Sequence, residues 1–71
     1  MNAVSTVTPI RLRRWTPPTH YAQYERLSDG KPFVVRSVFP ADQQVRIEAD
    51  DGERAFPFAN QLAADYREIR L

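Results

Sequence analysis

The sequence predicts one mainly β domain: a small barrel of about five short antiparallel strands, with a short helical turn before the last strand and a flexible basic N-terminal arm. Three observations predict this fold class. The chain has 71 residues and no cysteine, which limits it to one modest core without disulfides. Turn-forming residues separate short apolar segments about every ten residues. Apolar and polar residues alternate in several of these segments, as is typical of half-buried strands.

We divide the chain into three parts. Residues 1–9 show no periodicity and are expected to be a disordered tail. Residues 10–18 form the basic arm, which begins with an alternating segment compatible with a short strand and ends at Pro17 and Pro18, which favour an extended connection. Residues 19–71 form the barrel domain. Both a single helical turn after Thr19 and a strand from Tyr21 fit its first residues.

The elements of the barrel follow from apolar alternation and turn chemistry. We expect strands at residues 23–27, 33–39, 44–49, 53–58 and 66–71, and a helical turn at residues 60–64 with Asn60 as its cap. Gly30 supplies positive φ in one turn, and Asp51-Gly52 predicts a type I′ hairpin. Pro57 indicates that residues 53–58 form an edge strand or contain a bulge.

The same alternation predicts the core. It places five aliphatic side chains inside: Val35, Val45, Ile47, Leu62 and Ile69. The four phenylalanines, Phe33, Phe39, Phe56 and Phe58, fit a core better than a ligand platform, although a domain of this size cannot bury all of them. Phe56 and Phe58 share strand parity with Arg54. Either Arg54 lies at an exposed strand end, or this face is an exposed aromatic ridge.

In this order of elements, residues 23–71 resemble an SH3-like barrel, the arrangement shared by SH3, Tudor and related small β modules. The resemblance rests on the strands, the Asp51-Gly52 hairpin and the helical turn before the last strand. The chain lacks the paired tryptophan and the acidic loop with which SH3 domains bind proline-rich ligands. The resemblance therefore implies a fold and does not imply that activity.

The residue types that catalysis requires are sparse. His20 is the single histidine and cysteine is absent, which excludes cysteine–histidine nucleophiles and thiolate metal sites. Asp50 and Asp51 lie at a solvated hairpin tip, where burial cannot raise a carboxyl pKa. The chain has no glycine-rich phosphate loop. We therefore expect no enzyme, no catalytic residue, no cofactor and no bound metal.

The charges indicate where a partner binds. The first twenty residues carry three arginines and no acid, whereas the remainder carries seven bases and nine acids, so the net charge of +1 is an arm of +3 on a body of −2. Such asymmetry indicates an arm that meets an acidic partner. Arginines beside an aromatic side chain are typical of binding hot spots. The candidate partner-binding residues are Ile10, Arg11, Leu12, Arg13, Arg14 and Trp15, together with Phe56 and Phe58 of the ridge.

A second interpretation of the arm is structural. Ile10, Leu12 and Trp15 would cover one end of the barrel while the arginines stay in water. Both interpretations hold if the arm folds onto the barrel and leaves its arginines facing outward.

We expect a small non-enzymatic protein-binding regulator that docks on a larger macromolecular machine and modulates or inhibits it. Three arm arginines displace about three counterions, too few for tight general binding of nucleic acid. In size and arm chemistry the chain is similar in type to small phage-encoded inhibitors of host enzymes such as bacterial RNA polymerase. This resemblance implies a phage-type regulator of bacterial transcription.

Two alternatives remain: an SH3-like nucleic-acid-binding module that uses the arm with Arg36, Arg46 and Arg54, and a structural or assembly subunit. One contiguous basic stripe of these three arginines favours nucleic acid, and their dispersion among acids favours protein. No segment approaches the roughly 18 apolar residues of a membrane span. We expect a cytoplasmic protein with no membrane partner, and a monomer by default.

Overall fold

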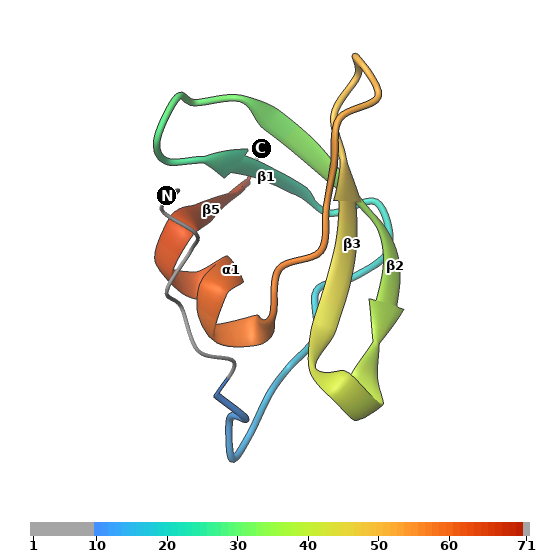
Figure 1. Cartoon of the computed structure of the whole chain (residues 1–71), viewed down its shortest axis with the longest axis vertical. Helices are drawn as coiled ribbons and strands as arrows, with labels where there is room; N and C mark the ends of the chain where they lie inside the picture. The colour runs from blue at the N-terminus through green and yellow to red at the C-terminus, as the bar shows by residue number, and fades with distance from the viewer. Residues whose placement is uncertain (1–9, 71) are drawn as a thin grey trace, which may run out of the picture.

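The computed structural model describes residues 10–70, which form a five-stranded antiparallel sheet with one short helix (Figure 1). The expected disordered tail, residues 1–9, lies outside the described residues, as does residue 71. The strands are β1 (Gln23–Arg26), β2 (Pro32–Phe39), β3 (Gln44–Glu48), β4 (Arg54–Ala55) and β5 (Tyr66–Ile69). A 3₁₀ turn, η1 (Pro40–Asp42), follows β2, and helix α1 (Ala59–Asp65) precedes β5. The predicted order of elements is confirmed.

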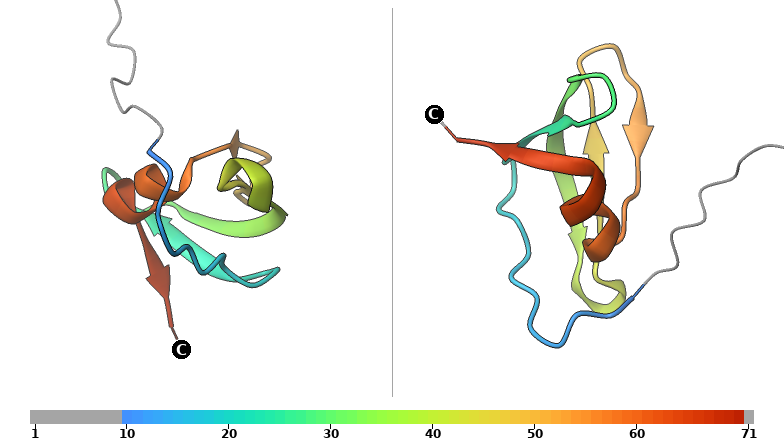
Figure 2. Two further views of the ribbon diagram at one scale, coloured as in Figure 1. Left: turned by 90° about the horizontal axis from the view of Figure 1, so that it is seen from below. Right: turned by 90° about the vertical axis from the view of Figure 1, so that its left-hand side faces the viewer.

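The sheet is open, so the predicted closure into a barrel is wrong. The strand order is β4-β3-β2-β1-β5, which leaves β4 and β5 as its two edges. Strand β4 has two residues, and Pro57, which has no N–H to donate, soon follows it. Helix α1 lies between the two ends of the twisted sheet (Figure 1), and β5 runs across the direction of β2 and β3 (Figure 2). The helix occupies the space that closure would require.

Strand β2 carries a bulge that changes which residues face the core. Its register against β3 shifts between Val35 and Ser37. Phe33 and Val35 are buried, and Val38, three residues after Val35, packs against the same core. Without the extra residue, Ser37 would face inward. The bulge therefore places Val38 inside and leaves Arg36 and Ser37 together on the other side of the sheet.

The core lies on the side of the sheet that α1 covers. Its buried members are Phe33, Val35, Val45, Ile47, Ala49 and Leu62, against which Trp15, Ala22, Tyr24, Val38, Ala55 and Tyr66 pack. Four of the five predicted core residues are confirmed. Ile69 is half-buried and lies outside this cluster, because it ends the edge strand β5 and pairs with the exposed Gln23. Phe33, which is 1% exposed, takes a central place in the core.

The glycine turns are confirmed, with one difference in turn type. Gly30 and Gly52 have φ of 73° and 93°. A type I′ turn needs two consecutive residues with positive φ, but Gly52 is the one residue of the β3–β4 loop with positive φ. The Ala49 amide donates to the Glu53 carbonyl at 2.8 Å. The loop is thus a three-residue hairpin with glycine in the left-handed position.

Replacing Val45 with aspartate should unfold the domain. Val45 is 1% exposed, so Val45→Asp buries an unpaired carboxylate, at a cost comparable with the roughly 4–10 kcal/mol total stability expected for this size. Urea titration followed by circular dichroism measures the effect. The control Gln23→Asp, at an exposed position of β1, should cost less than about 1 kcal/mol. A cooperative transition of Val45→Asp near the wild-type midpoint would contradict this core assignment.

Candidate functional site

The described part of the arm, residues 10–18, lies against the body of the domain (Figure 2). Its strongest attachment is a pair of hydrogen bonds between Leu12 and the side chain of Gln43. The Leu12 amide donates to Gln43 Oε1 at 2.6 Å, and Gln43 Nε2 donates to the Leu12 carbonyl at 2.9 Å. The carboxamide of Gln43 thus pairs with the arm as a neighbouring strand would.

Hydrogen bonds hold the backbone of Gln43 as well as its side chain. It has a left-handed backbone, with φ of 49°, at the end of η1, and its amide donates to the Pro40 carbonyl. Its carbonyl accepts the Ala59 amide at the start of α1, at 2.8 Å. The residue is 9% exposed, so an unpaired carboxamide would be costly there. The amide and the carbonyl of Leu12 are the hydrogen-bond partners of this carboxamide.

Two further bonds hold the first residues of the arm. The Ile10 amide donates to Asn60 Oδ1 at 3.3 Å, and Arg11 Nη1 donates to the Ala41 carbonyl at 2.7 Å. Asn60 is therefore not the helix cap that its composition predicted, because the N-cap of α1 is Phe58. The expected short strand is absent from residues 10–18, and the chain bends at Arg13 and Arg14 instead.

Trp15 attaches the arm to the body on the C-terminal side of the bend at Arg13 and Arg14. Its half-buried ring packs against the core and lines a groove of about 250 Å³ between the arm, α1 and β5. Leu12, Pro18, Tyr24 and Tyr66 line the same groove. Burial raises the pKa of both tyrosine hydroxyls, as expected for phenols beside apolar surface. The structural interpretation of Trp15 and Leu12 therefore holds, whereas Ile10 is 59% exposed.

Arg13 and Arg14 are the exposed part of the arm. Both side chains are exposed, and no hydrogen bond or ion pair joins either of them to another residue in the range 10–70. Leu12 and Trp15, one on each side, contact the body. Two cations are thus presented on a bend that is held at both ends.

The surface of the sheet opposite α1, which we call the outer face, carries the other predicted arginines. Glu48 is the cross-strand neighbour of Arg54, and Arg46 is the neighbour of Ser37. Arg36 Nε and Arg54 Nε lie 3.6 and 3.9 Å from the Glu48 carboxylate. Arg36, Arg46 and Arg54 therefore share one face, and a single acid lies between two of them.

Arg46 differs from its two neighbours on the outer face. It has no ion pair within residues 10–70, and its Nε atom is buried without a hydrogen-bond partner among them. A buried N–H donor of a charged group is costly to leave unpaired. Of the three arginines of the outer face, Arg46 is therefore the one whose charge is not paired with an acid of residues 10–70.

Aromatic side chains flank these arginines. Phe56 and Phe39 are 51% and 40% exposed, and Phe58, next to Gln44 across the ladder, is half-buried. Arg54 and Phe56 are both exposed, whereas Pro57 between Phe56 and Phe58 is buried. Of the two residues of the suggested ridge, Phe56 is thus exposed and Phe58 is half-buried, and both lie far along the chain from the arm residues with which they were grouped.

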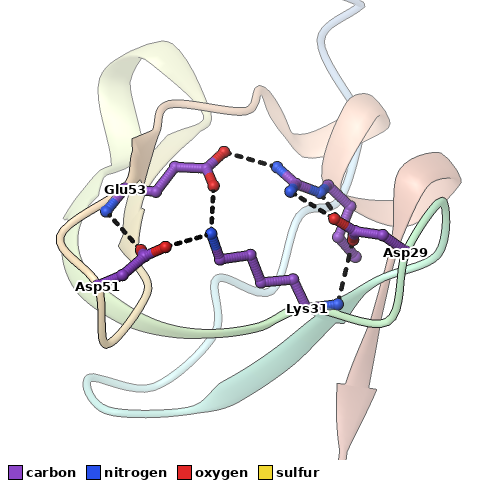
Figure 3. A network of polar contacts seen from close by, with 5 residues as sticks. Asp29, Lys31, Asp51 and Glu53 are labelled. Atoms are coloured by element: carbon purple, nitrogen blue, oxygen red, sulfur yellow. Dashed lines mark hydrogen bonds and ion pairs between the residues drawn. The ribbon is translucent and has the colours of Figure 1, made fainter.

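A cluster of ion pairs joins the β1–β2 turn to the β3–β4 hairpin (Figure 3). Arg26 Nη1 contacts Glu53 at 2.8 Å and Arg26 Nη2 contacts Asp29 at 2.7 Å. Lys31 Nζ contacts Asp51 at 2.6 Å and Glu53 at 2.7 Å. The hydrogen bond from Arg26 lowers the pKa of Asp29 to about 2. Hydrogen bonds from Lys31 and Arg26 likewise lower the pKa of Asp51 and Glu53.

Asp51 and His20, two residues that the sequence analysis considered for catalysis, make structural contacts. The pKa of Asp51 is lowered rather than raised, because it is paired with Lys31. The His20 ring stacks on Tyr21 with centroids 4.2 Å apart. Among residues 10–70, no group of three or more histidine, aspartate or glutamate side chains is arranged to hold a metal ion. Within the same residues, no helix is long and apolar enough to cross a lipid bilayer.

Comparison of the chain with models of known protein families, with curated proteins and with solved structures finds no match. The site is therefore interpreted from its own geometry. Sequence reasoning missed Gln43, because nothing in the pattern marks a glutamine that adopts positive φ. It also missed the bulge, although the polar pair Arg36-Ser37 inside an apolar segment was a usable signal.

Replacing Gln43 with alanine should loosen the arm. Gln43→Ala leaves the amide and carbonyl of Leu12 without their partners, which should cost about 1–3 kcal/mol of unfolding free energy. Hydrogen exchange at the Leu12 amide should accelerate, and Trp15 fluorescence should shift to longer wavelength. Gln44→Ala, whose side chain has one exposed bond to the Phe56 carbonyl, is the control. Fast exchange of the Leu12 amide in the wild type, or unchanged slow exchange in Gln43→Ala, would contradict this attachment.

The ion-pair cluster predicts a loss of stability in acid. Because folding lowers the pKa of Asp29 and Glu53 from their usual values of 3.8 and 4.5, their contribution is present above those values and is lost as the pH falls through the lowered ones. The urea midpoint should therefore decrease between pH 4.5 and pH 2. Lys31→Gln should make this decrease smaller. Arg70→Gln removes the same charge elsewhere and should leave the decrease unchanged.

Proposed function

We propose that this chain is a small non-enzymatic protein-binding regulator that docks on a larger macromolecular machine and modulates or inhibits its activity. The observation that carries the proposal is the presentation of Arg13 and Arg14, which are exposed and unpaired within residues 10–70 while Leu12 and Trp15 hold the backbone on both sides. Two adjacent cations on a restrained bend are available to the carboxylates of a partner.

Restraint of the bend reduces the cost of binding. Immobilising a flexible side chain or loop at an interface costs about 0.5–1.5 kcal/mol for each rotamer-rich side chain, and more where the backbone must also be ordered. Here the backbone on both sides of Arg13 and Arg14 already has hydrogen-bonded or packed neighbours. Planar guanidinium groups on such a segment suit bidentate contacts with carboxylates of a partner protein.

Apolar surface next to the arginines supports a protein partner for the arm. Ile10 is 59% exposed, and the groove beside Trp15 has Leu12 and Pro18 in its lining. Protein interfaces combine an apolar centre with a polar rim, and arginine and tryptophan are enriched at their hot spots. Two unpaired arginines by themselves would give nucleic acid a weak, salt-sensitive attachment.

We propose bacterial RNA polymerase as the first machine to test. The specific role that we propose is that of a phage-type regulator of bacterial transcription. The support for this choice is the small size and the arginine-rich arm, which are similar in type to small phage-encoded inhibitors. We also propose that the domain resembles an SH3-like fold. Its element order supports this resemblance, including the helix before the last strand, although the sheet is open.

Removing Arg13 and Arg14 should abolish partner capture without affecting the fold. Arg13→Ala/Arg14→Ala removes two exposed, unpaired charges, so its melting temperature should stay near that of the wild type. Capture of purified bacterial RNA polymerase, and of proteins from bacterial lysate, should decrease at least about tenfold. Arg67→Ala/Arg70→Ala removes one charge from β5 and one from the residue that follows it, and serves as the matched control.

Trp15→Ala separates anchoring from recognition, because it should lower both stability and capture, whereas the double arginine variant lowers capture alone. Full capture by the Arg13→Ala/Arg14→Ala variant would show that the arm is not the recognition element. An equal loss in the β5 control would show a general effect of charge.

A further inference from the structure

The charged residues of the outer face are not explained by the protein-binding role that we propose for the arm. Over β2, β3 and β4 the outer face carries three arginines, Arg36, Arg46 and Arg54, and one carboxylate, Glu48, so the local charge of this part of the face is positive although the body of the chain is acidic. Most acids of the body are engaged elsewhere. Asp29, Asp51 and Glu53 pair with Arg26 and Lys31 in the cluster of Figure 3, and Glu25 and Glu68 pair with Arg67 and Arg70.

The bulge in β2 creates a depression on this face. Arg36 and Ser37 both turn outward there, and a hollow of about 440 Å³ is lined by His20, Arg36, Ser37, Val38 and Phe39. This volume is within the range of small-ligand sites, about 300–1,000 Å³. Arg46, the cross-strand neighbour of Ser37, flanks the hollow.

Aromatic rings are available for stacking around the hollow. Phe39 is 40% exposed and Tyr21 is 62% exposed. Tyr21 is already stacked on His20 at 4.2 Å, and the Arg36 guanidinium lies 5.7 Å from the centre of the Tyr21 ring. Phe56, 51% exposed, lies near the β4 edge of the same face. Exposed rings alternating with arginines on an antiparallel sheet are the groups that stack on bases and pair with phosphates of a single strand.

We propose that the outer face binds single-stranded nucleic acid, with a base stacked on Phe39 in the hollow and phosphates on Arg36 and Arg46. Charge complementarity supports this occupant, because the part of the face formed by β2, β3 and β4 carries three arginines and one glutamate, and Arg46 has no ion-pair partner among residues 10–70. Asp50 and Glu48 line a second hollow at the other end of β2. The strand therefore runs from the first hollow toward Phe56, away from these acids.

This site is separate from the proposed protein-binding arm. No residue of the range 10–18 lines the hollow, and Arg13 and Arg14 have no contact with its residues. The proposal therefore does not rest on the arm being a recognition element, and either one can fail while the other holds.

Fluorescence anisotropy with a labelled oligothymidylate of about ten nucleotides, a length within the usual footprint of such sheets, tests the proposal. We expect binding at low salt, with a log–log salt slope of about −1.4 for two phosphate contacts on a single strand. A duplex of the same length should bind at least about tenfold more weakly, because its bases cannot stack on exposed rings. Absence of binding at low salt, or equal affinity for the duplex, would overturn the proposal.

Variants locate the site. Arg46→Gln and Arg36→Gln should each reduce the magnitude of the salt slope by about 0.7. Phe39→Ala should weaken binding about tenfold and leave the slope unchanged. Arg70→Gln removes the same charge from a side chain that is 84% exposed on the opposite edge of the sheet, and should change affinity less than about twofold. A loss in Arg70→Gln equal to that in Arg46→Gln would overturn the proposal.

Amide chemical shifts of the wild-type protein provide a readout that does not depend on the folding of any variant. Addition of the oligothymidylate should shift the amides of Ser37, Phe39 and Arg46. Shifts confined to residues 10–15, or loss of oligonucleotide binding in Arg13→Ala/Arg14→Ala, would place the nucleic acid on the arm and overturn the assignment. If the outer-face variants lose protein capture and the wild type binds no oligonucleotide, the face is a protein interface.

Discussion

The carboxamide of Gln43 is the contact on which the arrangement of the arm, η1, β3 and α1 depends. Its backbone closes η1 on Pro40 and accepts the first amide of α1, while its side chain pairs with Leu12. A buried amide needs partners, and here they come from a segment thirty-one residues away in the sequence. In a domain with so small a core, this polar junction fixes the positions of α1 and Trp15, which together cover the apolar side of the sheet.

The bulge in β2 determines which residues of this strand face the core and which lie on the outer face. It keeps Phe33, Val35 and Val38 in one core although their spacing does not alternate, and it turns Arg36 and Ser37 outward together. Packing and surface chemistry are therefore coupled at one position. A deletion that removed the bulge would change the faces of every later residue of β2, so the core and the outer face cannot vary independently there.

The fold could be predicted from the sequence where a pattern is local. Alternation at Val45 and Ile47, and the glycines at 30 and 52, identified strands and turns because side-chain parity and positive φ leave direct signals. Barrel closure was wrong because it depends on whether two distant edges meet, which α1 and the short β4 prevent. The arm was found from its charge, whereas its attachment required Gln43, a residue whose role arises from tertiary contacts. Parity linked Phe56 to Arg54 but left open whether that face is exposed, and the structure shows that both side chains are exposed.

Net charge is a poor guide to what this chain binds, because its charges are organised locally. A body of −2 suggests repulsion of phosphates, yet five of its acids are already paired with other basic residues, away from Arg36, Arg46 and Arg54. At physiological ionic strength the screening length is about 8 Å, so a ligand on the outer face responds mainly to the charges beside it. Those charges are three arginines and one glutamate. The arm follows the same rule: Arg13 and Arg14 act as a local pair of cations whatever the total charge, and each surface must be judged by the residues within one screening length.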